Sequence, residues 1–151
     1  MNMSREILFR EKKVDGGEWL EGYIVKKHGL YFLYDIKNSG TCRQNNYLVE
    51  KDTICQYTGL IDKNRKKIFE GDILRGFQYP FCYDGYYNYY AEVIFANCSF
   101  MTYTHKNPLS SVRGISDGNT ELMECWVGED WEVIGNIYDN SELLEVVYEK
   151  E

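Results

Sequence analysis

The sequence predicts an all-β protein of mainly antiparallel strands, either an SH3-like small barrel or two intimate β subdomains with a short C-terminal helix. Three observations support this class. Short extended segments alternate with turn-forming residues at near-regular spacing. The 151 residues include 14 Tyr, 7 Phe and 3 Trp but only 2 Pro, a composition that favours strands. A helix is indicated only over Ser141–Val146, where Asn140 can cap the first turn.

The strand segments are recognised by runs of aliphatic and aromatic residues between polar or glycine-bearing turns. Lys27-His28-Gly29 should reverse the chain into a hairpin, and Ala96-Asn97-Cys98 should do the same later. Residues 36–46 and 105–119 are predicted loops. The expected strands, in chain order, are 6–10, 19–25, 30–34, 47–49, 53–55, 56–58, 67–69, 73–74, 90–95, 99–103, 122–127 and 131–137.

Residues 56–74, QYTGLIDKNRKKIFEGDIL, form the most informative segment, a hairpin-like element followed by a strand start. Asn64 tolerates a positive φ, but the next position, normally glycine, is Arg65. A non-glycine residue in the left-handed region costs on the order of 1 kcal/mol, so either the turn differs or the strain is tolerated. Gly71 is expected to adopt a conformation closed to other residues.

Four sequence blocks in order, QYTGL, DKN, IFEGDIL and WEVIGNIYDNSELLE, resemble the YopX-like family of phage and prophage proteins from near Arg5 to about Glu145. The sequence departs from the expected family pattern at Arg65, where glycine would stand. The resemblance implies one YopX-like domain over 1–151, or two subdomains at 5–58 and 59–146, in a phage- or prophage-encoded protein of the bacterial cytoplasm. Because the family has no established biochemical activity, the resemblance assigns no functional residues.

Charge, cysteine content and the lack of long apolar runs limit the partners, metal sites and cell compartment that we expect. The formal charge of −7 opposes nonspecific attraction to nucleic acid and anionic membranes, although it leaves room for a local basic face. The five cysteines are odd in number and form no zinc-like pattern, so we expect reduced, mostly buried thiols and no metal. The sequence has no signal peptide and no run of about 18 apolar residues, which favours a cytoplasmic protein without a membrane partner.

No catalytic or cofactor motif is recognisable: GxSxG, GxxxxGK[ST], HExxH and GxGxxG are all absent, and no cofactor is expected. His28 and His105 are expected to be solvated surface residues rather than general bases. Glu70 and Asp72 alternate along a strand and could form an acid/base or metal pair. Turn and strand-start chemistry explains both carboxylates more simply, so an enzyme of unrecognised type is only the third hypothesis.

Two segments could bind a partner. In residues 77–90, aromatic side chains accompany Pro80 and Gly85, which suggests either a protein-binding loop or packing in a core or homo-oligomer. The basic turn, residues 63–67, could bind phosphates or be a solvated hairpin tip. The leading hypothesis is a noncatalytic β-barrel protein that binds a host or phage protein, and the alternative is a nucleic-acid-binding module. The candidate partner contacts are Tyr79, Phe81, Tyr83, Tyr86 and Tyr87, and the candidate phosphate contacts are Lys63, Arg65, Lys66 and Lys67.

Overall fold

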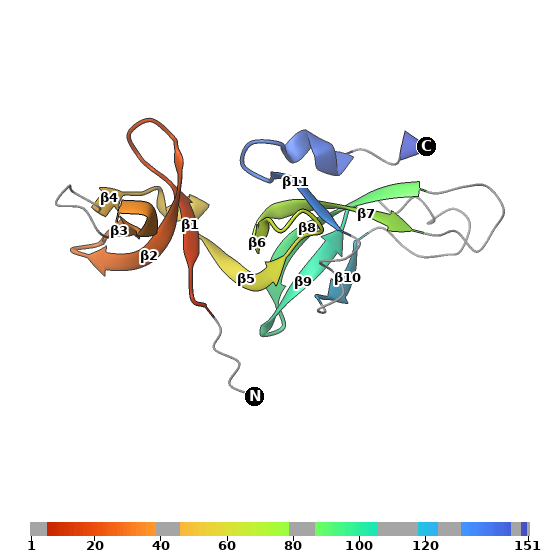
Figure 1. The fold of residues 1–151 in the computed structure, drawn as a ribbon, viewed down its shortest axis with the longest axis horizontal. Helices are drawn as coiled ribbons and strands as arrows, with labels where there is room; N and C mark the ends of the chain where they lie inside the picture. The colour runs from red at the N-terminus through yellow and green to blue at the C-terminus, as the bar shows by residue number, and fades with distance from the viewer. Residues whose placement is uncertain are drawn as a thin grey trace. The chain divides into compact units, whose positions relative to one another are not determined.

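The computed structural model describes residues 6–38, 46–78, 87–105, 118–123, 131–145 and 149–150. These residues form two antiparallel β-sheets (Figure 1), which confirms the all-β prediction. Neither sheet closes into a barrel within the described ranges. The chain divides into two compact units, residues 1–59 and 60–151. Within the same ranges, no helix is both long enough and apolar enough to cross a membrane.

The first unit is a twisted sheet in the order β4-β3-β2-β1, with β5 beside β1. An antiparallel bridge between Lys13 and Val49 also ties the chain after β4 to the end of β1. β5 then carries the chain into the second unit. The elements are β1 (Phe9–Lys12), β2 (Trp19–Lys27), β3 (Leu30–Asp35), η1 (Ile36–Asn38), β4 (Asn46–Leu48), η2 (Lys51–Thr53) and β5 (Cys55–Ile61).

The β2–β3 hairpin has the turn that the sequence predicts. His28 and Gly29 both have positive φ, 53° and 80°, as a two-residue type I′ turn requires. The turn fixes the register, which places Tyr23 opposite Tyr34. A side chain at Gly22 would collide with the carbonyl group of Tyr34, so the close approach of the two strands depends on this glycine.

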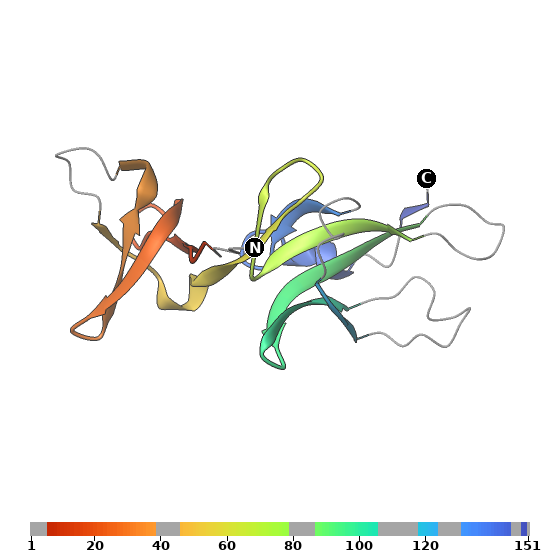
Figure 2. The same ribbon diagram turned by 60° about the horizontal axis from the view of Figure 1, so that its bottom comes forward.

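The second unit is a sheet in the order β10-β9-β8-β7-β11, and β12 pairs with β8 (Figure 2, green to blue). Its core gathers fully or nearly fully buried side chains from several strands, including Ile68, Leu74, Val93, Trp131 and Val133. The elements are β6 (Lys67–Phe69), β7 (Asp72–Gln78), β8 (Tyr87–Ala96), β9 (Ser99–Thr104), β10 (Asn119–Leu122), β11 (Glu132–Asn136), η3 (Ser141–Glu145) and β12 (Glu149–Lys150).

The helix predicted over Ser141–Val146 is instead the short 3-10 segment η3. Leu143 N donates to the carbonyl of Asn140, the i to i+3 bond of a tight turn. The Asn140 side chain lies back on β11, where its Oδ1 accepts a hydrogen bond from Asn136 N at 3.4 Å. Because the side-chain amide of Asn140 closes the turn after β11, it does not cap the first turn of a regular helix.

Neither of the cysteines that the structure describes, Cys55 and Cys98, forms a disulfide bond. Cys55 is fully buried, as expected for a core thiol, whereas Cys98 is exposed in the β8–β9 turn. Asn97 and Cys98 both have positive φ there, so this hairpin closes with the same turn geometry as β2–β3.

The first unit buries one carboxyl group that has no hydrogen-bond partner among the described residues. Glu11 in β1 is 0% exposed, and neither of its carboxylate oxygens has a hydrogen-bond partner among the described residues. Burial raises the pKa of Glu11 from 4.5 to about 7. The folded protein therefore holds this proton over a pH range in which the unfolded chain has released it.

This burial makes stability depend on pH. Between pH 4.5 and about 7 the native state binds more protons at Glu11, so its share of the free energy of unfolding falls as pH rises, by about 3 kcal/mol in all. Glu11→Gln should remove that fall, as measured by urea unfolding at pH 5 and pH 8. Glu18→Gln, in the exposed turn before β2, is the control and should keep it. Equal pH dependence in the Glu11→Gln protein and the wild type would contradict the assignment.

Candidate interaction surfaces

Large apolar side chains gather on one face of the β2–β3–β4 sheet, which we call the apolar face. Residues directly opposite each other in an antiparallel pair point to the same side. The register pairs Tyr23 with Tyr34 and Val25 with Phe32, and Phe32 in turn pairs with Leu48. The apolar face consists of Tyr23, Val25, Leu30, Phe32, Tyr34 and Leu48, of which all but the half-buried Phe32 are between 38% and 56% exposed.

The other side of these strands faces the interior of the first unit. Leu33 is fully buried, and Asp35 is 5% exposed. Burial therefore alternates along β3 with the two-residue period of a strand. The sequence indicated both strands but not the exposed side, because apolar residues occur on both faces of the hairpin. Contiguous exposed apolar patches larger than roughly a few hundred Å² are rare on monomeric soluble proteins and often mark binding sites.

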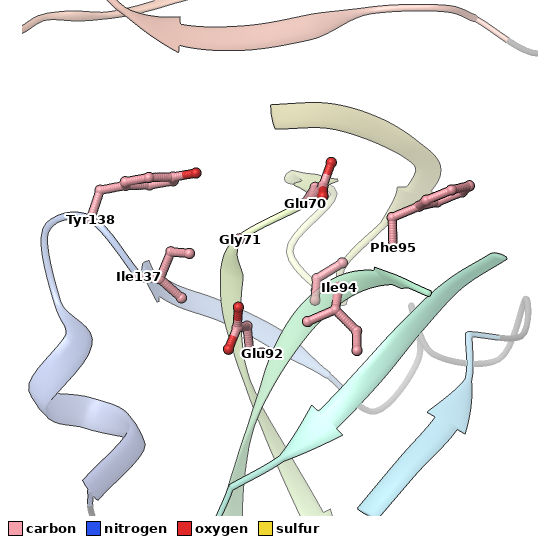
Figure 3. A pocket seen from close by; sticks show the side chains of 8 residues that line it. Glu70, Gly71, Glu92, Ile94, Phe95, Ile137 and Tyr138 are labelled. Atoms are coloured by element: carbon pink, nitrogen blue, oxygen red, sulfur yellow. The ribbon is translucent and has the colours of Figure 1, made fainter. Parts of the chain in front are cut away.

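The second unit has a small pocket of about 150 Å³ where the β6–β7 turn meets β8 and the segment after β11 (Figure 3). Gly71 N donates to the Val93 carbonyl at 2.7 Å, and Ile137 N donates to the Gly71 carbonyl at 2.9 Å. Gly71 has a φ of 75°, which confirms the predicted use of glycine. A Cβ atom here would lie 3.3 Å from the Tyr138 ring, so glycine also keeps this wall of the pocket open.

The residues that line the pocket include Glu70, Glu92, Phe95 and Tyr138, together with aliphatic residues. Because side chains alternate along a strand, Glu92 and Phe95 point to opposite faces of β8. Tyr138 and Phe95 lie towards opposite sides of the pocket in Figure 3, and Glu70 lies between them in that view. Glu92 comes from β8, and its Oε2 lies 2.7 Å from His105 Nε2. The sequence did not indicate this grouping, because its members come from separate parts of the chain.

The structure gives Glu70 and Asp72 different roles. Asp72 is fully buried, and its Oδ2 accepts a hydrogen bond from Phe69 N at 2.8 Å, which is the turn chemistry expected of it. Glu70 instead lines the pocket. Among the described residues, no group of three His, Cys, Asp or Glu side chains is placed to hold a metal ion.

The two histidines also differ. His28 is exposed in its turn, as predicted. His105, expected to be a solvated surface residue, has a side chain 36% exposed that contacts Glu92 and meets the Tyr103 ring edge-on at 4.6 Å. Its position at the end of β9, beside β8, accounts for this difference.

The four predicted phosphate contacts lie in and just after one turn, but they are not equivalent. The Lys63 ammonium lies 2.8 Å from Glu132 Oε2, and the Arg75 guanidinium lies 3.0 Å from the same oxygen. Hydrogen bonds from Lys63 and Arg75 lower the pKa of Glu132. Arg65 and Lys66 are exposed, and Lys67 is half-buried at the start of β6. Lys63 thus already serves as an ion-pair partner within the unit.

The predicted aromatic contacts lie largely outside the described residues. Tyr79, Phe81, Tyr83 and Tyr86 belong to the range 79–86, for which no structure is described. Tyr87 begins β8, where its backbone pairs with Gln78 and Lys150. Their assignment as partner-binding residues stays a prediction from sequence.

The fold defines an all-β protein of two sheets whose described surface includes an exposed apolar face and an acidic, aromatic-lined pocket. Residues 9–145 match the family described as YopX protein, so the chain belongs to the YopX family and the resemblance seen in the sequence is confirmed. The crystal structure of protein EF1440 from Enterococcus faecalis is similar, with 25% identity and a TM-score of 0.50, over 93% of this chain and 99% of that chain. A comparison with curated proteins found no match.

The basic turn gives a direct test of backbone strain. Arg65 has a φ of 66°, so the strain that the sequence suggested is present. Arg65→Gly should raise the free energy of unfolding by about 1 kcal/mol relative to Arg65→Ala, because only glycine adopts this conformation without a Cβ penalty. Urea unfolding of the two variants measures the difference while removing the charge in both. An Ala variant as stable as the Gly variant would show that the turn is unstrained.

Proposed function

We propose that this YopX-family chain is a phage- or prophage-encoded, noncatalytic interaction protein that binds a host or phage protein in the bacterial cytoplasm. The observation that carries the proposal is the apolar face of the first unit, with five large side chains at least 38% exposed. The similarity to a protein from a bacterium, Enterococcus faecalis, supports a bacterial setting. The proposed phage origin rests on the resemblance of the four sequence blocks to the YopX-like family of phage and prophage proteins.

The chemistry of the apolar face suits a protein partner. Two tyrosines, Tyr23 and Tyr34, stand directly opposite each other on neighbouring strands. Tyrosine is enriched at protein interfaces because it combines a large apolar ring with a polar hydroxyl. Residues that alternate along paired strands form a continuous surface, and an apolar surface of another protein can cover it. None of the six side chains lines the pocket of the second unit.

The free energy of burying the apolar face sets the strength of binding that this face can support. Fully burying a large apolar side chain gives about 1.5–3 kcal/mol, so covering the exposed parts of six gives on the order of 6 kcal/mol. Association itself costs at least about 4 kcal/mol. The apolar face therefore suits the centre of an interface rather than a complete one. The aromatic segment, residues 77–90, is a proposed further contact with the partner, through Tyr79, Phe81, Tyr83, Tyr86 and Tyr87.

Nucleic-acid binding, the alternative predicted from the basic turn, receives less support. Residues 60–151, which contain this turn, have eight Lys and Arg against 16 Asp and Glu, a net charge of −8. Lys63 is also held by Glu132 at 2.8 Å. A module that grips phosphates needs a net positive surface at the contact.

The proposal is tested by capturing partners from bacterial lysate with the tagged full-length chain. Tyr23→Ser/Tyr34→Ser should reduce recovery of a specific partner protein at least about tenfold, because it removes two aromatic contacts worth about 1 kcal/mol or more each. Ile7→Ser/Ile61→Ser removes two exposed apolar side chains outside the apolar face and should leave recovery unchanged. Equal recovery by both variants would refute docking on this face.

Two further arms of the same experiment separate the alternatives. Tyr83→Ser/Tyr86→Ser/Tyr87→Ser should abolish capture if the aromatic segment contributes as proposed, and unchanged capture would remove that segment from the interface. Nuclease treatment of the lysate should leave recovery of the partner intact. Recovery that requires nucleic acid, and that falls steeply with salt, would favour the nucleic-acid-binding alternative. A second copy of the chain as the captured protein would identify the face as a homo-oligomer interface.

A further inference from the structure

The β2–β3 hairpin carries positive charge next to the apolar face. Residues 22–34, GYIVKKHGLYFLY, contain Lys26 and Lys27 but no Asp or Glu. The register pairs Lys27 with Leu30, so the exposed Lys27 side chain points to the side of the apolar face. Lys26 points to the other side, where its ammonium lies 5.3 Å from the centre of the Tyr31 ring. A cation therefore borders the apolar face at the tip of the hairpin.

The same side of the sheet also carries basic side chains at the opposite end of β2. The register places Lys12 opposite Trp19. It also places Arg10 opposite Glu21. The Arg10 guanidinium lies 4.6 Å from the centre of the Trp19 ring, and the Lys12 ammonium lies 5.3 Å from it. On this side of β1–β4 the charged strand residues are three basic and one acidic: Arg10, Lys12, Lys27 and Glu21.

The hairpin tip is the more strongly basic of the two ends. Trp19 and Lys27 are the first and last residues of the nine-residue strand β2. At roughly 3.3 Å per residue they lie about 26 Å apart, so the two ends meet different parts of a partner. The turn beyond Trp19 contains Lys13 but also Asp15 and Glu18, whereas no acidic residue accompanies Lys27 on the hairpin. Charge complementarity therefore acts mainly at the tip.

These charges disfavour a second copy of the chain on the apolar face. If two copies pack face to face with β2 running in the same direction, Lys27 meets Lys27 of the other copy. If β2 runs in opposite directions, Lys27 meets the end that carries Arg10 and Lys12. In neither arrangement does Lys27 meet an excess of acidic groups, and like charges brought together weaken binding. The whole chain carries −7, so two copies also repel each other at longer range.

We infer that the apolar face binds an acidic surface of a different protein, on which carboxylates that pair with Lys27 lie beside the apolar contact residues. The inference rests on the proposed protein-binding function and adds the chemistry of the partner. Apolar contacts supply the affinity. The charge at the hairpin tip orients the partner along β2 and excludes basic surfaces.

Two short peptides with the same apolar residues serve as probes, acetyl-ELEFELE-amide and acetyl-KLKFKLK-amide. In the full-length chain labelled with ¹⁵N, the acidic peptide should shift the backbone amide resonances of Tyr23, Val25 and Tyr34 saturably. The expected dissociation constant is on the order of 1 mM. The basic peptide should bind at least about fivefold more weakly. Equal binding of the two peptides, tighter binding of the basic one, or no saturable shift with the acidic one would overturn the inference.

Variants assign the preference to the hairpin tip. Lys27→Glu should weaken binding of the acidic peptide about fivefold and strengthen binding of the basic peptide, because it reverses the charge beside the apolar face. Tyr23→Ser/Tyr34→Ser should weaken binding of both peptides. Lys66→Glu makes the same change of charge at an exposed position of the second unit and should bind both peptides like the wild type. A loss in Lys66→Glu as large as in Lys27→Glu would indicate nonspecific charge attraction and refute the inference.

Sedimentation velocity tests the exclusion of a second copy. The full-length chain should be monomeric at micromolar concentration. A dimer that dissociates in the Tyr23→Ser/Tyr34→Ser variant would place a second copy on the apolar face and overturn the inference.

The two proposals fail separately, because the peptides are measured without a partner. Equal binding of the two peptides, together with capture of a protein that depends on Tyr23 and Tyr34, removes the acidic partner and keeps docking on the apolar face. A clear preference for the acidic peptide, together with no captured protein that depends on the two tyrosines, removes the proposed function and keeps the charge preference of the face.

Discussion

The second unit depends on one buried carboxylate. Asp62 is 2% exposed, and its two oxygens accept three backbone hydrogen bonds, from Asn64 and Lys66 at 2.8 Å and from Val133 at 2.9 Å. A buried ionised group is costly unless hydrogen bonds replace its water. Here the replacement comes from both ends of the unit in sequence, because Val133 lies 71 residues after Asp62. The carboxylate therefore closes a local turn and fastens that turn to β11.

The neighbouring contacts follow from this attachment. Lys63 N donates to the Trp131 carbonyl at 3.0 Å, and the Lys63 ammonium pairs with Glu132. Trp131 and Val133 then pack with Ile68 in the core. Further along the same two segments, Ile137 N bonds to the Gly71 carbonyl and brings Tyr138 to the pocket. The acidic pocket is thus a consequence of how β11 is held against the turn after β5.

Local chemistry made much of the fold predictable from sequence. The turn at His28-Gly29 and the glycine at position 71 use conformations that residue type indicates. In the Asn97-Cys98 turn only Asn97 is of a type that favours its positive φ. The strained Arg65 was visible as a residue where glycine was expected. The helix after Asn140 was mispredicted because the asparagine side chain bonds to β11, a tertiary contact that a local capping signal does not contain.

The candidate surfaces were less predictable for two physical reasons. The β2–β3 hairpin is apolar on both sides, so alternation alone did not show that Tyr23 and Tyr34 are exposed while Leu33 is buried. The pocket joins Glu70, Glu92 and Tyr138 through strand pairing, and no spacing rule relates residues so far apart. The phosphate interpretation of the basic turn treated Lys63 as available, because its partner Glu132 is distant in sequence.

Docking on the apolar face is tested most directly by hydroxyl-radical footprinting of the full-length chain, alone and saturated with the captured partner protein. The oxidation rate of an aromatic side chain reports its exposure to solvent. Slower oxidation of Tyr23 and Tyr34 in the complex, with the exposed Ile7 and Ile61 unchanged, is the predicted result. Unchanged oxidation of both tyrosines, with protection confined to other residues, would contradict a role for the apolar face in binding.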